Sequence, residues 1–313
     1  DLCMSVMKKF EEIDYVRSVL MAIVILVHIV NFGTLYPMFK QSMFTFFMPA
    51  FLIITGYLVN IEKSVGGFLK YFLRLVLPYV IMVTSFSVLS VFLPVRDGLT
   101  SLSLETVCER VFVRSIGPYW FFYDMIVCGT AYYVVFRLFP SLSKVSRLSL
   151  FAFSLYLLAF FLPLLTPADA TLFFMGAVLR QNEVSFVKAF PASVFSLLPF
   201  LVLIFQPELW HKWICLVLPF FAVSFLLWCH GKTPERFRVV MCYFGRNTLP
   251  VYIFHPIFTM MSKFYLPLFS FDRSGIVHAV VTIVVCFAGS IMIAKTLDKS
   301  GLSRVFGVVK LLR

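Results

Sequence analysis

Long apolar runs separated by short polar segments fill this chain from about residue 15 to residue 295. A helix needs about 20 mainly apolar residues to cross the hydrocarbon core of a bilayer. The chain is 61% hydrophobic and only 13% charged, so it has too few polar residues to cover the surface of a soluble domain. These features predict an all-α, polytopic integral membrane protein.

The apolar runs predict ten transmembrane helices, and the run at 170–180 is the shortest of them. They lie at 15–35, 43–60, 71–93, 118–138, 148–163, 170–180, 191–206, 213–230, 248–268 and 275–295. Without the helix at 170–180, every later loop would lie on the opposite side of the membrane.

The basic residues orient these helices, because lysine and arginine concentrate in cytoplasmic loops. With the N-terminus in the cytoplasm, the ten helices leave 20 of the 27 basic residues on the inner side. The outer side holds Lys40, Arg96, Arg110, Arg114, Lys212, Lys263 and Arg273. Both termini are therefore expected in the cytoplasm. The net charge of +12 follows from this topology and does not indicate nucleic-acid binding.

No internal repeat and no long linker divides the chain. We therefore expect one membrane-embedded domain over residues 1–313. It would comprise a cytoplasmic segment at 1–14, a transmembrane bundle at 15–295 and a basic amphipathic tail at 296–313 on the inner leaflet. The outer loop at 94–117 is polar enough to form a short surface helix.

The first predicted helix carries Asp14 and Arg17 at its start and His28 deep inside. Eleven residues separate Arg17 from His28, so both lie on one face of the helix, about 16 Å apart along its axis. Two roles stay open for Arg17: a basic residue that anchors the topology, or the anion-binding end of the helix. His28 suits either a structural hydrogen bond to a neighbouring helix or a functional role, which ionisable residues within membranes usually have.

Other ionisable groups lie at membrane depth in later helices. Asp124 needs a partner, for which His28, Arg114 or a water-filled cavity are candidates. His255 lies about 12 Å into its helix from the inner end, so it approaches the depth of His28 from another helix. His255 also precedes Pro256, where a kink would open space for a ligand.

For several further residues, a structural role and a ligand-binding role both stay open. Lys70 and Arg74, at i and i+4, are either topology anchors or a clamp for phosphate. Tyr57 follows Gly56 near the inner face, where helix packing explains it equally well. Tyr119 and Trp120 suit the outer aromatic belt. No zinc, phosphate-loop or dinucleotide motif is present, and no metal is expected.

Ordered motifs in the chain resemble those of the acyltransferase type 3 family, integral membrane enzymes that O-acylate sugars and surface polysaccharides. "IDYVRSVLMAIVILVH" is similar to the family's Arg-x10-His motif. "FFMPAFLIITGY", "FLRLVLPY", "YWFFYDMIV", "FFMGAVLR" and "NTLPVYIFHP" follow in order. Ser18 stands where a glycine or alanine is commoner. The chain shows no hydrolase-like domain and lacks the acid-rich fourth span of one branch, which favours the stand-alone sugar acetylases.

The resemblance implies an acyl-CoA donor, usually acetyl-CoA, that enters from the cytoplasm, and a multi-pass protein of the bacterial inner membrane. It makes Arg17 and His28 the motif residues. Tyr57, Arg74, Trp120 and His255 also fall on recurring positions of the family. The acceptor implied is a hydroxyl of a sugar, a polysaccharide or a lipid-linked glycan in contact with membrane lipids.

These features together predict a mechanism. His28 would be the general base, oriented by Asp124 or His255, and an acyl-histidine intermediate stays open. Coenzyme A is anionic, so we expect its nucleotide end at Arg17 and at three further residues, Lys70, Arg74 and Arg180. Tyr57 would stabilise the oxyanion. Tyr119 and Trp120 would contact the acceptor.

A second hypothesis is a proton-coupled transporter of a small anion or a lipid-linked sugar, because buried His and Asp also suit a proton relay. The lack of an internal repeat argues against it. A structural or chaperone-like subunit is a third hypothesis, which the convergent polar groups disfavour. The acyl group's length, the membrane side of the acceptor and the oligomeric state, a homodimer included, stay open.

Overall fold

A computed structural model describes residues 10–92, 98–99, 101–210 and 214–313. The first nine residues of the predicted cytoplasmic segment lie outside this set. All regular structure in the described residues is helical, which confirms the all-α prediction.

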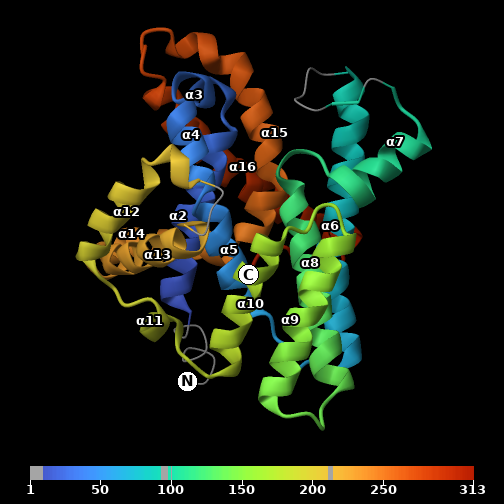
Figure 1. The fold of residues 1–313 in the computed structure, drawn as a ribbon. Helices are drawn as coiled ribbons and strands as arrows, with labels where there is room; N and C mark the ends of the chain where they lie inside the picture. The colour runs from blue at the N-terminus through green and yellow to red at the C-terminus, as the bar shows by residue number, and fades with distance from the viewer. Residues whose placement is uncertain (1–9, 93–97, 100, 211–213) are drawn as a thin grey trace. The chain divides into compact units, whose positions relative to one another are not determined.

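The longer helices follow the predicted apolar runs, and short 3-10 or π turns extend several of them (Figure 1). The α-helices are α2 (Glu11–His28), α3 (Val30–Leu35), α4 (Pro37–Phe44), α5 (Phe47–Leu58), α6 (Val65–Phe92), α7 (Leu104–Glu109), α8 (Trp120–Leu138), α9 (Lys144–Phe161), α10 (Pro167–Gln181), α11 (Phe186–Ala189), α12 (Leu197–Ile204), α13 (Ile214–Lys232), α14 (Glu235–Arg246), α15 (Thr248–Tyr265) and α16 (Ile276–Ser300). The short turns are η1 (Arg110–Arg114), η2 (Gly117–Tyr119), η3 (Val194–Ser196), η4 (Pro207–Leu209), η5 (Leu266–Phe269) and η6 (Leu302–Phe306).

Five helical stretches among the described residues are long and apolar enough to cross a membrane. They are Pro37–Leu58, Val65–Phe92, Gly117–Leu138, Lys144–Phe161 and Ile276–Ser300, and two shorter apolar helices cover Val194–Ile204 and Leu216–Lys232. The remaining predicted spans fall on α2, α10 and α15. The structure thus supports a polytopic membrane protein, and the number of ten crossings stays a prediction.

The chain divides into two compact units, and the division falls within α5. The first unit contains residues 1–51, 184–299 and 311–313, and the second contains 52–183 and 300–310. Each unit therefore joins segments that are far apart in the sequence. The prediction of one domain over the whole chain is not tested by this division.

In the first unit, α2 packs against α13, α14 and α15 (Figure 1). More than half of its residues are buried, and five of them follow one another at intervals of three or four positions: Ile13, Val16, Leu20, Val24 and Val27. This spacing places them on one side of a helix. The helix ends at His28, because the next residue adopts an extended backbone conformation and α3 begins one residue later.

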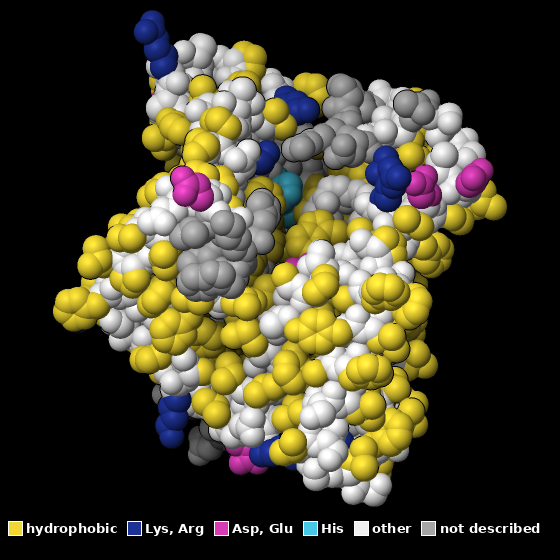
Figure 2. Space-filling view, viewed as in Figure 1, with side chains coloured by type: hydrophobic (Ala, Val, Ile, Leu, Met, Phe, Trp, Pro, Cys, Tyr) yellow, Lys and Arg dark blue, Asp and Glu magenta, His cyan; other side chains and the backbone are white. Residues whose placement is uncertain are grey.

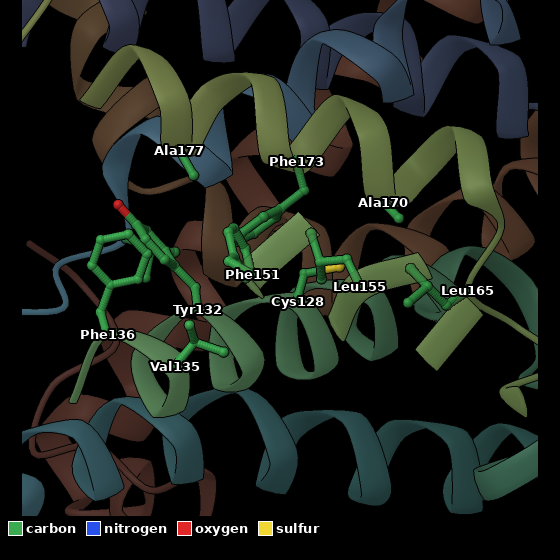
Figure 3. Packing of buried hydrophobic residues seen from close by; sticks show 11 residues of the cluster. Cys128, Tyr132, Val135, Phe136, Phe151, Leu155, Leu165, Ala170, Phe173 and Ala177 are labelled. Atoms are coloured by element: carbon green, nitrogen blue, oxygen red, sulfur yellow. The ribbon is translucent and has the colours of Figure 1, made fainter. Parts of the chain in front are cut away.

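In the second unit, aromatic side chains from α8, α9 and α10 form a buried cluster (Figure 3). Tyr132 stacks on Phe151 with ring centroids 4.9 Å apart, and Phe173 meets Phe151 edge-on at 6.4 Å. Gln181 donates a hydrogen bond to the Tyr132 hydroxyl at 2.6 Å. The cluster buries the tyrosine ring while its polar tip keeps a partner.

Two glycines bring α5 and α10 of the second unit into backbone contact. A Cβ atom on Gly56 would lie 2.1 Å from the carbonyl oxygen of Phe173, and one on Gly176 would lie 2.0 Å from that of Ile53. Both distances are far below van der Waals contact. The two helices can therefore cross this closely only because both positions lack a side chain.

The outer surface of α9 is apolar. Phe153, Phe160 and Phe161 expose 64%, 82% and 70% of their area, and many hydrophobic side chains lie on the surface of α8 and α9 in Figure 2. Large exposed apolar patches indicate a lipid or protein environment in place of water. This surface agrees with the membrane assignment.

The predicted outer loop contains α7 and η1, so a short helix does form there. The predicted tail begins inside α16, which extends to Ser300 before η6 follows. Gly307 has a φ of 73°, and a Cβ atom there would lie 2.9 Å from the carbonyl oxygen of Leu73. The tail therefore folds back onto α6 of the second unit. Its place on the inner leaflet stays a prediction.

Candidate functional site

The start of α2 runs parallel to α14 and to the beginning of α15. Cys242 Sγ contacts the carbonyl oxygen of Glu11 at 3.4 Å, Gly245 packs on Asp14, and Arg17 binds Thr248. Successive contacts are three residues apart on both segments, and the residue numbers rise together, so the two segments run in the same direction. This register aligns the polar residues of α2 with those of α14 and α15 along the shared face.

Gly245 sets the distance between α14 and α2. A Cβ atom at this position would lie 1.7 Å from the Asp14 carbonyl oxygen, so any side chain forces the helices apart. Arg246 and Thr248 follow directly and contact Asp14 and Arg17. The close approach therefore also positions these polar contacts.

We expect Gly245→Ala to lower the free energy of unfolding by about 1–3 kcal/mol, because it overpacks a backbone contact. Gly231→Ala is the matched control in the same unit, since nothing lies within 4 Å of the place where its Cβ atom would sit. Thermal unfolding of the purified protein in detergent compares the two variants. Equal midpoints for both would contradict the close-packing account.

Arg17 lies in a polar cluster at the start of α2. Its guanidinium forms an ion pair with Asp14 at 3.3 Å and donates a hydrogen bond to the Thr248 hydroxyl. Asp14 also pairs with Arg246 at 3.8 Å. Two arginines thus share one carboxylate, and this leaves an excess of positive charge that favours an anion.

His28 ends α2 and is held by its own helix. Its Nδ1 lies 2.6 Å from the Val24 carbonyl oxygen, which can only accept a hydrogen bond. Nδ1 therefore carries the proton in the neutral ring, and the lone pair lies on Nε2. A neutral imidazole with a free Nε2 lone pair can accept a proton.

His255 of α15 has the same arrangement and is fully buried. Its Nδ1 faces the carbonyl oxygens of Val251 and Tyr252 at 3.2 and 3.0 Å, while its Nε2 has no hydrogen-bond partner among the described residues. The His28 and His255 rings meet edge to face, with centroids 5.5 Å apart and planes at 72°. The predicted approach of the two imidazoles is confirmed.

Arg17 and His28 use the same side of α2. Arg17 contacts Thr248 and His28 contacts His255, and both partners belong to α15. The predicted common face is therefore confirmed, and it faces a protein helix. One face thus joins a cationic end to a pair of imidazoles about 16 Å away along the axis. Such an arrangement can hold an anionic group at one end and move a proton at the other.

The predicted base partner Asp124 belongs to the second unit. It is fully buried on α8, and neither carboxylate oxygen has a hydrogen-bond partner among the described residues. A buried carboxyl without a partner is costly. Its predicted role beside His28 stays a prediction.

The other predicted ligand-binding residues also belong to the second unit. Tyr57 is buried at the α5–α10 crossing, and Arg180 is partly buried on α10. On α6, Lys70 is exposed and Arg74 is partly buried. Their donor-binding roles stay predictions.

The two aromatic residues predicted to contact an acceptor differ in exposure. Tyr119 is fully buried and packs on Phe86 with ring centroids 5.5 Å apart, whereas Trp120 is partly exposed. Trp120 therefore offers more surface to a ligand. Their substrate-binding roles stay predictions.

Sequence reasoning missed Thr248 and the Val24 carbonyl. Thr248 is 231 residues from Arg17, and no local pattern links the two. The Val24 contact follows from the i, i+4 geometry of a helix, but the choice of side-chain rotamer is visible only in the structure.

Comparison with known proteins adds independent information. Residues 10–295 match the family described as "Acyltransferase domain", which covers most of the chain and includes Arg17, His28, Asp124 and His255. Comparisons with curated proteins and with solved structures give no match. The predicted resemblance is confirmed, and the chain belongs to the acyltransferase 3 family.

Proposed function

We propose that this protein is a membrane O-acyltransferase that moves an acyl group, preferably acetyl, from acyl-CoA to a hydroxyl of a sugar or glycan. The family match supports acyl transfer. The rest of the proposal depends on the pairing of His28 with His255 of α15, because His28 and Arg17 share one face of α2. The ten-span topology would open the Arg17 end of α2 to the cytoplasm.

His28 would act as the general base. Its free Nε2 accepts the hydroxyl proton as the alcohol oxygen attacks the thioester carbon. The carbon–sulfur bond then breaks, and the leaving thiolate takes the proton from the imidazolium. The Val24 carbonyl supports this role because it fixes the tautomer that leaves Nε2 unprotonated.

Arg17 would hold the anionic end of the donor. Its guanidinium is fixed by Asp14 and Thr248, so little side-chain freedom is lost when an anion binds. Lys70, Arg74 and Arg180 are further candidates for donor binding. The proposed path for the acyl group leads from Arg17 along α2 to His28.

Three residues of the second unit keep proposed roles in acyl transfer. Asp124 keeps its proposed role of orienting the base, and its two buried carboxylate oxygens have no hydrogen-bond partner among the described residues. Trp120 offers an aromatic face, and Tyr57 would stabilise the oxyanion. We expect Asp124→Asn to weaken acceptor use more than donor binding.

Arg17→Gln provides the test of donor binding. We expect it to weaken coenzyme A affinity by about 10-fold or more, because a charge-assisted contact is lost. Calorimetry on the purified protein measures the affinity, and transfer of radiolabelled acetyl groups in membranes measures activity. Wild-type protein that neither binds coenzyme A nor transfers acetyl would overturn the proposed function.

A further inference from the structure

The last three described residues return to the first unit and are held there by α16. The Asp298 carboxylate accepts hydrogen bonds from the backbone N–H groups of Leu311 and Leu312, at 2.7 and 3.1 Å. The Leu311 side chain is almost fully buried. The carboxylate and the buried leucine together fix the course of this segment.

The Asn247 side chain forms hydrogen bonds with both the N–H and the carbonyl oxygen of the Arg313 backbone. Its Oδ1 accepts a hydrogen bond from the Arg313 N–H at 2.8 Å, and its Nδ2 donates to the Arg313 carbonyl oxygen at 3.4 Å. Asn247 is fully buried and also donates to the Tyr243 carbonyl oxygen at 2.9 Å. Because it lies between Arg246 and Thr248 in the chain, it joins Arg313 to the cluster around Arg17.

Three arginines are neighbours at this end of α2, because the Arg313 backbone is bound to Asn247, the residue that follows Arg246. Arg17 and Arg246 pair with Asp14, and the charge of Arg313 acts on both Asp14 and Arg17. These four side chains carry three positive charges and one negative charge. Like charges brought this close repel one another, and an anion with several oxygens would relieve the repulsion. Arginine suits a phosphoryl group, since its planar fork can donate two parallel hydrogen bonds.

We propose that Arg17, Arg246 and Arg313 form one binding site for a phosphoryl group, and that the 311–313 segment completes it. Asn247 is then a positioning residue that holds Arg313 in place. The inference rests on the proposed function in one respect, namely that the phosphoryl group belongs to the acyl-CoA donor. The reason for this choice is that the site and His28 lie on the same face of α2.

The test compares Arg313→Gln with Arg304→Gln. Arg304 is an exposed arginine on η6 of the same tail and is outside the cluster, so its substitution removes the same charge. Calorimetry measures the affinity of each purified variant for coenzyme A, 3′-dephospho-coenzyme A and pantetheine. We expect Arg313→Gln to weaken coenzyme A binding by about 10-fold, and Arg304→Gln to leave it unchanged. Pantetheine lacks the phosphate groups of coenzyme A, so its affinity should not respond to Arg313→Gln.

Two further measurements complete the test. Asn247→Ala should reproduce the loss while Arg313 keeps its charge, and Arg313→Lys should restore part of the affinity. Nanodiscs with and without phosphatidylglycerol test a lipid phosphate as the alternative ligand. Arg313→Gln that leaves coenzyme A affinity unchanged, or that weakens only binding to anionic lipid, would overturn the inference. Wild-type protein that does not bind coenzyme A would instead overturn the proposed function on which it rests.

Discussion

His28→Ala is expected to lower acyl transfer by about 10²–10⁴-fold, the usual contribution of general acid–base catalysis. Coenzyme A affinity should change little, because the proposed anion site lies about 16 Å away along α2. The physical reason is that the variant lacks the Nε2 lone pair that takes the hydroxyl proton. Incorporation of radiolabelled acetyl groups into the glycan fraction of membranes measures the rate, and calorimetry measures donor affinity.

His278→Ala is the matched control for this experiment. His278 is also buried, its Nε2 donates to the Ser262 carbonyl oxygen at 3.1 Å, and its Nδ1 has no hydrogen-bond partner in the described part of the chain. It lies beside Tyr265 and Phe269, away from the paired imidazoles. Per folded molecule, we expect wild-type turnover from His278→Ala. Normal turnover from His28→Ala would rule out the base assignment.

Gly176→Ala is expected to destabilise the second unit by about 1–3 kcal/mol or more, since overpacking at a backbone contact forces the helices apart. The added Cβ atom would lie 2.0 Å from the Ile53 carbonyl oxygen and 2.8 Å from the backbone nitrogen of Tyr57. Neither is the flexible end of a side chain, so relief requires α5 and α10 to separate. The thermal unfolding midpoint in detergent measures the effect.

Gly66→Ala is the control for Gly176→Ala, because we expect it not to destabilise the protein. Gly66 lies in the first turn of α6, and nothing lies within 4 Å of the position its Cβ would occupy. Alanine is the better helix former, so this variant should be as stable as the wild type or more stable, by up to about 1 kcal/mol. A stability for Gly176→Ala that matches that of Gly66→Ala would contradict the backbone contact between α5 and α10.

The sequence predicts the helices well because long apolar runs leave the backbone no other way to satisfy its hydrogen bonds in lipid. Each of the ten predicted runs falls on a helix. α14 was missed, because the segment "ERFRVVMCYFGR" carries too many charges to be read as a span. Its role depends on Gly245 meeting Asp14, a contact between residues 231 positions apart.

Only part of the site could be predicted from the sequence, because spacing within one helix is visible there and tertiary contacts are not. The common face of Arg17 and His28 follows from helical periodicity within one helix, so spacing alone was enough. A comparison of depths placed His28 and His255 at a similar level, but their ring contact depends on how α2 packs on α15. Thr248 and Arg313, in contrast, reach Arg17 through tertiary packing and through a chain reversal after α16. Periodicity carries no information about either contact.

The most direct test is a cryo-EM structure with a non-hydrolysable acetyl-CoA analogue bound. We expect its phosphate groups at Arg17 and its acyl carbonyl near His28, close enough for an acceptor hydroxyl to reach Nε2 at about 3 Å. The pantetheine arm should span the distance of about 16 Å between them. An analogue bound with its acyl end far from His28, or with no phosphate at Arg17, would contradict the account.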